Sequence, residues 1–243
     1  MSWKTIFKTV FRRTGYEIWK VQAGKEYTLL LPYGCHTYSP WYEGWFQAIY
    51  DKIRDHTGIA EDRCYMLHRL SQHCSHLEGD FAECGVYRGG SAFLIALTLE
   101  RSGAQHKELH IFDTFKGMPG FADQDPSCHV EGHMGDVSLD AIKHYLRVFP
   151  FIVFHPGVIP ETFEAVKDKS FAFVHVDVDL YRSTRDCCAF FYDHLVSGGM
   201  MVVDDYGFPG YKLAAKQAVD EFFLDKPENP ISLRTGQCMV IKL

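Results

Sequence analysis

The amino-acid sequence predicts an α/β fold built on a doubly wound, seven-stranded and mostly parallel sheet, and two observations carry this prediction. First, the apolar runs Phe171–Val176 and Met200–Val203 are typical of buried parallel strands. Second, from Asp80 onward such runs alternate with stretches in which apolar residues recur every three or four positions, as they do in helices with one buried face. Regular alternation of this kind indicates strand–helix–strand units.

The expected elements can be given in chain order. Two helices, at residues 41–53 and 62–77, precede the sheet. Strands are expected at residues 80–84, 109–112, 151–154, 171–176, 200–203, 231–234 and 238–243. Between them, helices are expected at residues 91–99, 139–149, 161–166, 180–195 and 211–224. The pair Gly198-Gly199 is expected to end the helix that follows the fourth strand.

Composition and charge describe an ordinary soluble globular protein. Of the 243 residues, 47% are hydrophobic and 23% are charged, and no apolar run approaches the length of about 20 residues that a transmembrane helix needs. The net charge is −6 without a long basic run, so nucleic acid is not an expected partner. The eight cysteines follow no regular framework, which favours free thiols and a cytoplasmic location.

The N-terminal residues differ in character from the rest of the chain. We expect an extension at residues 1–60, on the acceptor side or at a subunit contact, before a catalytic domain at residues 61–243. Basic and apolar residues interleave over residues 3–13, which predicts a basic amphipathic helix without the apolar core of a signal peptide. Packing on the protein itself or in a homo-oligomer is favoured over contact with a membrane.

Acidic residues follow two of the predicted strands. Asp177 and Asp179 come after the run that ends at Val176, and Asp204 and Asp205 come after the run that ends at Val203. Because adjacent parallel strands finish at the same edge of a sheet, these carboxylates are expected to gather there. Carboxylate oxygens suit a hard divalent cation such as Mg²⁺. The alternative is that Asp204 and Asp205 form a turn that caps the following helix.

A glycine-rich turn follows the first strand of the alternating region. It runs from Gly85 to Ser91 and offers the amino terminus of a helix to an anionic group. The GxGxxG spacing is broken by Val86, which disfavours a nicotinamide dinucleotide. Glu83 suits a cationic amine, and Asp113, after the second strand, suits the hydroxyls of a ribose. A carboxylate, an ammonium and a ribose together describe S-adenosylmethionine.

Four motifs in order resemble those of the macrocin O-methyltransferase family, which are class I S-adenosylmethionine-dependent enzymes. They read FAECGVYRGGSA, HIFDTFKGMPGF, HVDVDLYRST and SGGMMVVDDYGFPGYKLAAKQAVDEFF, within residues 60 to 225. The resemblance implies a Rossmann-like sheet whose last strand is antiparallel. The acidic residues of this sequence also resemble those of catechol-type O-methyltransferases. Leu180, however, stands where those enzymes have a catalytic lysine.

The turn and the resemblance together give a set of expected site residues. The metal ligands are expected to be Asp177, Asp204 and Asp205, and Asp177 is the expected base, with Asp179 and His175 as alternatives. The expected cofactor-binding residues are Glu83, Gly85, Tyr87, Arg88, Gly89, Ser91, Asp113 and Asp177.

The predicted function is methylation of a hydroxyl on a sugar or glycosylated natural product by a Mg²⁺-dependent, S-adenosylmethionine-dependent enzyme. The loop at residues 114–136 is longer than a usual strand–helix connection and is expected to cover the acceptor, or else to be a mobile surface loop. Two alternatives stay open. One is a metal-independent small-molecule methyltransferase, and the other is an inactive cofactor-binding protein that acts through a partner.

Overall fold

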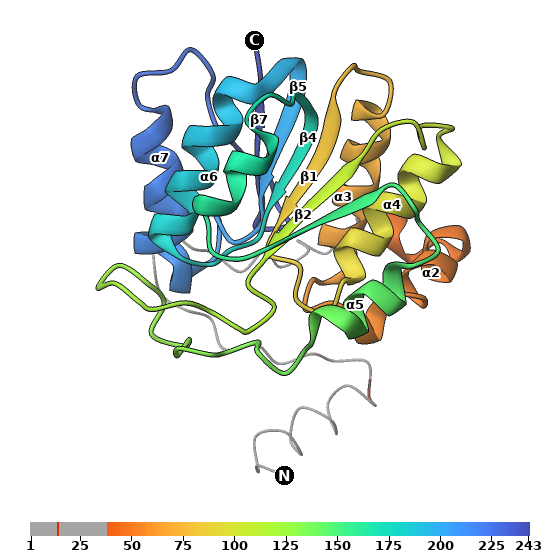
Figure 1. Ribbon diagram of the computed structural model, residues 1–243, viewed down its shortest axis with the longest axis horizontal. Helices are drawn as coiled ribbons and strands as arrows, with labels where there is room; N and C mark the ends of the chain where they lie inside the picture. The colour runs from red at the N-terminus through yellow and green to blue at the C-terminus, as the bar shows by residue number, and fades with distance from the viewer. Residues whose placement is uncertain (1–13, 15–37) are drawn as a thin grey trace. The chain divides into compact units, whose positions relative to one another are not determined.

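A seven-stranded sheet lies at the centre of the computed structural model (Figure 1). The structure describes residue 14 and residues 38–243, and Ser39–Leu243 form one compact unit. The predicted basic helix near the N-terminus and the strand-like run Tyr27–Leu31 lie outside the described residues.

The strand order is β3-β2-β1-β4-β5-β7-β6, and β1 to β5 run parallel. β7 is antiparallel to β5, so the predicted mostly parallel sheet with an antiparallel last strand is confirmed. The strands are β1 (Asp80–Cys84), β2 (Leu109–Asp113), β3 (Ile152–Pro156), β4 (Phe171–Val176), β5 (Leu195–Val203), β6 (Ile231–Ser232) and β7 (Cys238–Ile241). The chain reverses its winding direction between β1 and β4, which places a topological switch point at their carboxyl ends.

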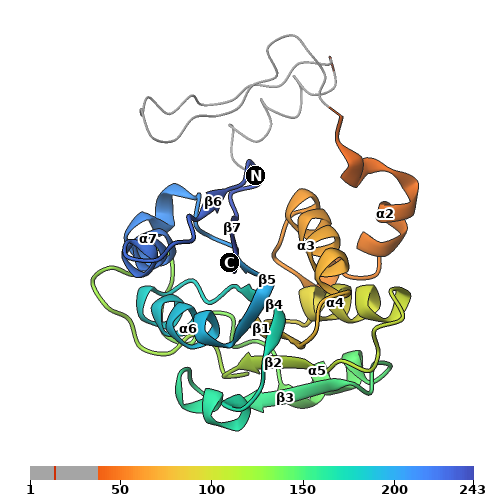
Figure 2. The same cartoon turned by 90° about the horizontal axis from the view of Figure 1, so that it is seen from above.

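Helices cover both faces of the sheet. Figure 2 shows α2, α3 and α4 on one side and α6 and α7 on the other. The helices are α2 (Gly44–Tyr50), α3 (Glu61–Cys74), α4 (Gly90–Arg101), α5 (Leu139–Leu146), α6 (Tyr181–His194) and α7 (Gln217–Phe223), with short helical turns η1 (Pro40–Tyr42), η2 (Arg54–His56), η3 (Glu161–Val166), η4 (Pro209–Tyr211) and η5 (Lys212–Lys216). Alternation along β1 divides its side chains, since Phe81 joins the core on the α4 side and Ala82 the core on the α6 side.

The boundary expected at residue 60 lies too late in the chain. Phe46, Ile49 and Ile53 are fully buried and belong to the same hydrophobic core as Leu94 of α4. Their spacing places them on one face of the segment, and that face packs on the sheet-covering helices rather than on a separate body. The compact unit therefore begins at Ser39.

The glycine pair Gly198-Gly199 does not end a helix. Helix α6 already ends at His194, and both glycines lie inside β5, which begins at Leu195. The pairing of β4 with β5 shifts register between Phe171 and Phe173, so the strand is irregular beside the glycines. A side chain at residue 199 would lie 2.8 Å from the carbonyl oxygen of Val196, which explains why only glycine fits.

The segment expected as one helix at residues 211–224 is a composite. It begins with the single turn η4, continues as the wider π-helical turn η5, and becomes α-helical only in α7. Wide turns of this kind are frequent beside functional sites. Here the irregular part directly follows the acids at the end of β5.

If residues 39–60 belong to the core, truncating Phe46 will destabilise the whole unit. We expect Phe46→Ala to lower the free energy of unfolding by about 3–5 kcal/mol, because it leaves a cavity in a fully buried position. Leu224→Ala, at a side chain that is 80% exposed, should change it by less than about 0.5 kcal/mol. Urea unfolding of both variants makes the comparison. If the two substitutions change the free energy of unfolding equally, residues 39–60 form a separate extension rather than part of the core.

Candidate active site

A cavity opens at the carboxyl ends of β1 to β5. One half is lined by the turn after β1, by the end of β2 and by the segment after β3, and the other half by the acids after β4 and β5. Residues 56–59, Arg63 and Tyr211 complete the wall, together with residues 117–119 and Met134 of the long loop. The cavity therefore spans the switch point between β1 and β4, where open α/β sheets bind their ligands.

The structure brings most of the predicted cofactor residues to this cavity. Those that line it are Gly85, Tyr87, Ser91, Asp113 and Asp177. The others, Glu83, Arg88 and Gly89, are not among the lining residues. The sequence alone could not make this separation, because all the residues of the turn lie within a few positions of one another.

Asp113 holds the shape of the turn. Its Oδ2 accepts hydrogen bonds from the backbone N–H groups of Val86 (2.7 Å) and Tyr87 (3.1 Å), and its Oδ1 accepts one from Phe115 (2.7 Å). A carboxylate offers about four lone-pair positions, so Oδ1 retains capacity for one more donor in the cavity. Tyr87 adopts a left-handed backbone conformation (φ 45°), which these bonds help to maintain.

The glycines of the turn are required by close backbone approach. A Cβ at residue 85 would lie 1.9 Å from the carbonyl oxygen of Asp177 on β4, so Gly85 admits the neighbouring strand end. At residue 90 it would lie 2.6 Å from the carbonyl oxygen of His56. Gly89 is left-handed (φ 86°) and precedes the first residue of α4. The glycines thus let three segments meet around the amino terminus of α4.

Glu83 and Arg88 have partners away from the cavity. Glu83 is fully buried, and its Oε1 lies 2.8 Å from Nδ1 of His175 on β4. Arg88 points outward and pairs with the exposed Asp136 at 2.5 Å. Glu83 and Arg88 therefore both contact other residues of the protein, and both contacts lie outside the cavity.

Three carboxylates converge in the acidic half. Single oxygens of Asp177, Asp179 and Asp205 all lie within 4.8 Å of one another. Burial and the Asp204 carboxylate raise the pKa of Asp177 well above its usual range. Burial and the carboxylates of Asp177 and Asp179 raise the pKa of Asp205 to about 10. Such shifts express mutual repulsion that a bound cation would relieve.

Asp204 differs from the other acids because it is already paired. Its Oδ2 accepts a hydrogen bond from Nη1 of Arg63 on α3, and its Oδ1 accepts one from Gln237 at 2.9 Å. Burial alone would raise the pKa of Asp204, but His175 and Arg63 hold it below its usual range. The structure therefore groups Asp179, rather than Asp204, with Asp177 and Asp205. Asp204, which the sequence predicts as a metal ligand, also lines the cavity but already accepts hydrogen bonds from Arg63 and Gln237.

His175 is also removed from the list of alternative bases by its position. It is fully buried on β4, between Glu83 and Asp204, and its Nε2 lies 3.8 Å from Oδ1 of Asp204. Burial would lower its pKa, but the neighbouring carboxylates of Asp204 and Glu83 raise it to about 10. The cavity lining does not include it. Because β4 ends at Val176, strand alternation does not extend from His175 to Asp177, and it does not place their side chains on one face.

The loop at residues 114–136 is attached to the site at several points. Backbone hydrogen bonds join Met118 to Gly132 and to His133, which closes the base of the loop. Asp125 accepts a hydrogen bond from the N–H of Tyr181 at the start of α6 (2.8 Å). His129 reaches the acidic half, where its Nε2 lies 2.8 Å from the Tyr211 hydroxyl and 3.6 Å from Asp179.

Several of these site residues carried no signal in the sequence. Arg63 lies 141 positions before its partner Asp204, and it stands on a helix whose pattern shows only which face is buried. His129 lies in a long loop, 50 positions before Asp179, and the loop sequence has no pattern that predicts their contact. Periodicity does not predict which side chains of distant elements meet, so such contacts require the structure.

Strand order, switch point and a cavity with a glycine-rich turn on one side and acids on the other define the class I methyltransferase fold. A solved structure of the O-methyltransferase NovP superposes with a TM-score of 0.67 at 24% identity, over 77% of this chain and 82% of that one. The calicheamicin methyltransferase CalS11 gives a TM-score of 0.62 at 14% identity, over 82% of this chain and 93% of that one. Both likenesses concern the fold.

A family model described as macrocin O-methyltransferase (TylF) matches residues 53–232. The chain belongs to the macrocin O-methyltransferase family. The resemblance noted in the sequence is thereby confirmed.

Three relatives are about a quarter identical to this chain over the residues that match. Demethyldecarbamoylnovobiocin O-methyltransferase of Streptomyces niveus is 28% identical over 158 residues, which are 61% of this chain and 59% of that protein. Mycinamicin III 3''-O-methyltransferase of Micromonospora griseorubida is 26% identical over 185 residues, which are 69% of this chain and 70% of that protein. A tetracenomycin 4'-O-methyltransferase of Streptomyces olivaceus is 27% identical, over 59% of this chain and 58% of that protein. This chain thus spans less than two thirds of two of these relatives.

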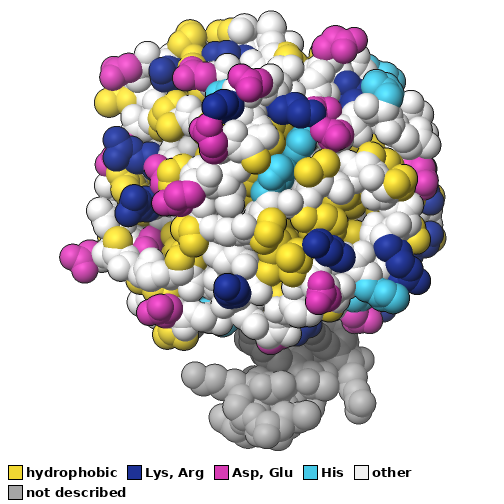
Figure 3. All heavy atoms as spheres, viewed as in Figure 1, with side chains coloured by type: hydrophobic (Ala, Val, Ile, Leu, Met, Phe, Trp, Pro, Cys, Tyr) yellow, Lys and Arg dark blue, Asp and Glu magenta, His cyan; other side chains and the backbone are white. Residues whose placement is uncertain are grey.

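The surface adds two observations. Figure 3 shows acidic and basic side chains intermixed on one face, without a continuous basic stripe. Within residues 38–243, no helix is long and apolar enough to cross a membrane.

The pairing of Arg63 with Asp204 can be tested by stability. We expect Arg63→Met to lower the free energy of unfolding by about 3 kcal/mol, because it leaves the buried Asp204 carboxylate without its cation. The double variant Arg63→Met/Asp204→Asn should recover much of this loss, since it removes the unpaired charge as well. Urea unfolding measures both. Additive losses in the double variant would show that the two side chains do not depend on each other.

Proposed function

We propose that this protein is an S-adenosylmethionine-dependent O-methyltransferase that uses a divalent cation such as Mg²⁺ to methylate a hydroxyl of a sugar or glycosylated natural product. The observation that carries the proposal is one continuous cavity with a cofactor-type turn at one end and three converging carboxylates at the other. The family and the named activities of its relatives support it.

The half of the cavity over β1 to β3 suits the cofactor. The amino terminus of α4, entered by Ser91, offers unpaired backbone N–H groups to the carboxylate of S-adenosylmethionine. Asp113 has capacity at Oδ1 for a ribose hydroxyl. Val158 and Ile159, after β3, add apolar wall on the same side, as a purine ring requires.

The acidic half fits a hard divalent cation. The converging groups supply oxygen ligands, and burial together with the neighbouring carboxylates raises the pKa values of Asp177 and Asp205. We therefore assign Asp177 and Asp205 as ligands of the cation, with the Asp179 carboxylate beside them. When bound, a divalent cation would lower the pKa of an acceptor hydroxyl held beside it.

The protein then needs to orient the acceptor, exclude water and remove one proton. A methyl group moves in line from the sulfonium to the hydroxyl oxygen, so the two reactants must meet over the switch point, between the turn and the acids. The proton passes to a carboxylate, and we assign this role to Asp179. Its Oδ1 faces the cavity and lies 3.6 Å from Nε2 of His129, beside the Tyr211 hydroxyl.

The acceptor class is inferred from the relatives and the loop. The name of one relative gives a tetracenomycin that carries a rhamnosyl group, methylated at the 4' position, and the name of another gives the 3'' position of mycinamicin III. In this chain Met118, Pro119 and Met134 of the loop give the cavity an apolar rim beside the acids. A partly apolar molecule that carries a hydroxylated ring fits both features.

Cofactor binding tests the first half of the proposal, with a pair of variants that the structure separates. We expect S-adenosylmethionine to bind in the micromolar range by calorimetry. Asp113→Asn should weaken binding about tenfold, because the turn loses acceptors for its N–H groups. Arg88→Met should leave affinity unchanged, since Arg88 points away from the cavity. If the protein binds no cofactor, the methyltransferase assignment fails.

The acidic half is tested by metal-linked stability and turnover together. Mg²⁺ at about 100 times its dissociation constant should stabilise the folded protein by about 2.7 kcal/mol. Asp205→Asn should lose this response and turnover with it, because one of three converging carboxylates is removed. Asp179→Asn should retain most of the metal response but lower kcat about 10²-fold or more.

The exposed Asp225→Asn serves as the matched charge control and should behave as wild type. Thermal unfolding with and without a chelator gives the first readout, and methyl transfer to hydroxylated glycosides gives the second. If turnover survives chelation, the enzyme is metal-independent. If Asp177→Asn, rather than Asp179→Asn, retains the metal response while losing turnover, then Asp177 is the base.

A further inference from the structure

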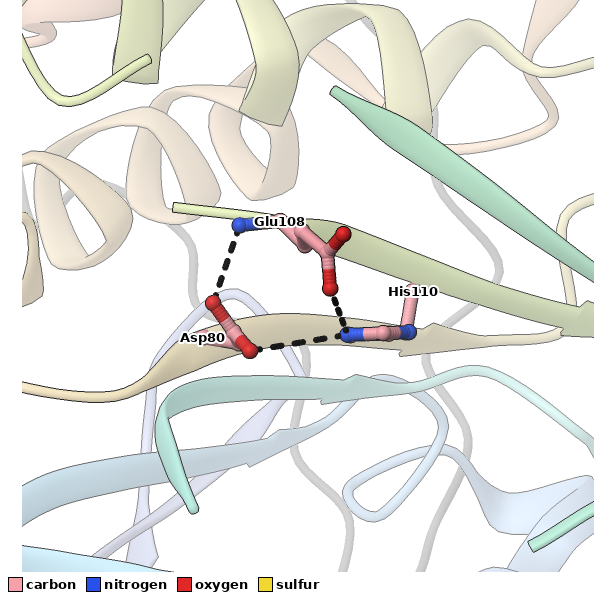
Figure 4. Close-up of side chains that lie close together, drawn as sticks. All are labelled: Asp80, Glu108 and His110. Carbon is pink, nitrogen blue, oxygen red and sulfur yellow. Dashed lines mark hydrogen bonds and ion pairs between the residues drawn. The ribbon is translucent and has the colours of Figure 1, made fainter. Parts of the chain in front are cut away.

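A second group of possible metal ligands lies at the opposite edge of the sheet. Asp80 begins β1, Glu108 immediately precedes β2, and His110 is the second residue of β2 (Figure 4). This is the amino-terminal edge of the strands, and none of the three residues lines the active-site cavity. A ligand here would be separate from the methyltransferase chemistry.

The three side chains point toward one another. Nε2 of His110 lies 3.6 Å from Oδ2 of Asp80 and 3.4 Å from Oε2 of Glu108, and all three atoms lie within 4.8 Å of one another. Tetrahedral ligation at bond lengths of about 2.0–2.2 Å requires ligand atoms about 3.3–3.6 Å apart. The two measured separations agree with this geometry.

His110 supplies an independent sign that something is missing between these groups. The residue is only 2% exposed, and its Nε2 atom is buried without a hydrogen-bond partner. A buried polar nitrogen without a partner is costly in a folded protein. Here the orphaned nitrogen faces two carboxylates at distances too long for good hydrogen bonds.

Neighbouring residues orient both the carboxylate of Asp80 and the imidazole of His110. Asp80 is fixed because its Oδ1 accepts a hydrogen bond from the backbone N–H of Glu108 at 2.9 Å, which turns Oδ2 toward His110. Nδ1 of His110 lies 2.9 Å from Nε2 of His155, and the His155 ring stacks on Phe112.

Nε2 of His155 can accept a hydrogen bond from the Nδ1–H of His110 when the His155 proton lies on Nδ1. The lone pair at Nε2 of His110 then points at the two carboxylates. Metal-ligating histidines commonly donate their other N–H group to a fixed acceptor in this way. The pair of histidines therefore matches the arrangement that a metal site uses.

We propose that Asp80, Glu108 and His110 bind a zinc-class divalent cation, with a water molecule as the fourth ligand. An imidazole beside two carboxylates favours Zn²⁺ or Co²⁺ over Mg²⁺. Glu108 is 44% exposed, which leaves solvent access for the fourth position. The site would join the start of β1 to the start of β2, so its expected effect is on stability rather than on the methyl-transfer step.

Lys169 competes for the same oxygens. Its ammonium lies 3.0 Å from Oδ2 of Asp80 and 2.5 Å from Oε2 of Glu108. The side chain is 40% exposed, and its flexible stem allows it to move into solvent when a cation arrives. Removing this charge should therefore strengthen metal binding, whereas a purely structural ion-pair cluster would only lose stability.

The test is titration of Zn²⁺, and of Co²⁺ followed by its visible spectrum, into the full chain after chelator treatment, with Mg²⁺ in large excess. Glu108→Gln should weaken Zn²⁺ binding at least about tenfold, because it removes an ionised ligand. We expect the protein to remain folded with this substitution. Lys169→Met should tighten it about tenfold, since one competing charge is lost. Asp205→Asn, at the other edge, should leave this binding event unchanged.

His110→Gln supplies the ligand test of the imidazole, with circular dichroism to show that the variant is folded. Its Co²⁺ complex should lose the imidazole-dependent spectrum, and should this substitution prevent folding, the Glu108 and Lys169 variants decide the question. Equal Zn²⁺ binding by wild type and Glu108→Gln would overturn the proposal. So would weaker binding in Lys169→Met, or a loss confined to Asp205→Asn, which would place the metal in the active site.

Discussion

The arrangement of the site depends on negative charge gathered where β1, β4 and β5 end. Glu83, Asp177, Asp179, Asp204 and Asp205 are all mostly buried there, and the strand order makes their proximity unavoidable. Buried carboxylates are stable only when paired, hydrogen-bonded or protonated. Among the described residues, Arg63 pairs with Asp204, and His175 pairs with one oxygen of Glu83. Asp179 and Asp205 have only the longer contacts to His129 (3.6 Å) and Arg63 (3.7 Å), so the protein's own pairing determines which carboxylates are most available to a ligand.

The same strand ends determine where a cofactor and an acceptor can meet. Gly85 allows the end of β1 to approach the Asp177 carbonyl oxygen so closely that no other residue would fit. The glycine-rich turn and the acidic group are therefore neighbours across one strand pair, rather than two separate sites. Asp113 also fixes the turn through two backbone hydrogen bonds, from Val86 and Tyr87, so the cofactor side has a geometry that the protein itself maintains. Such pre-formed geometry suits a reaction that depends mainly on orientation.

Sequence reasoning succeeded where the physical signal is local. A continuous apolar run predicted β4 with its observed bounds, and the acids after the strands predicted the edge at which the cavity lies. The sequence says less where the outcome depends on distant partners. It could not show that His175, 92 positions after Glu83, pairs with one oxygen of that residue. Gly198 and Gly199 looked like a helix stop because an irregular strand pairing cannot be read from one strand alone.

The long loop and the catalytic acids are mechanically connected. Asp179 has a left-handed backbone conformation (φ 61°), which is unfavourable for a residue with a side chain and needs support from its surroundings. Two residues later, the N–H of Tyr181 donates to Asp125 of the loop, and His129 of the same loop contacts the Asp179 carboxylate. The loop thus contacts both the backbone that follows Asp179 and the side chain of Asp179. Changes in the loop that alter acceptor preference would therefore also move the carboxylate to which we assign proton removal, so acceptor selection and catalysis are not independent in this fold.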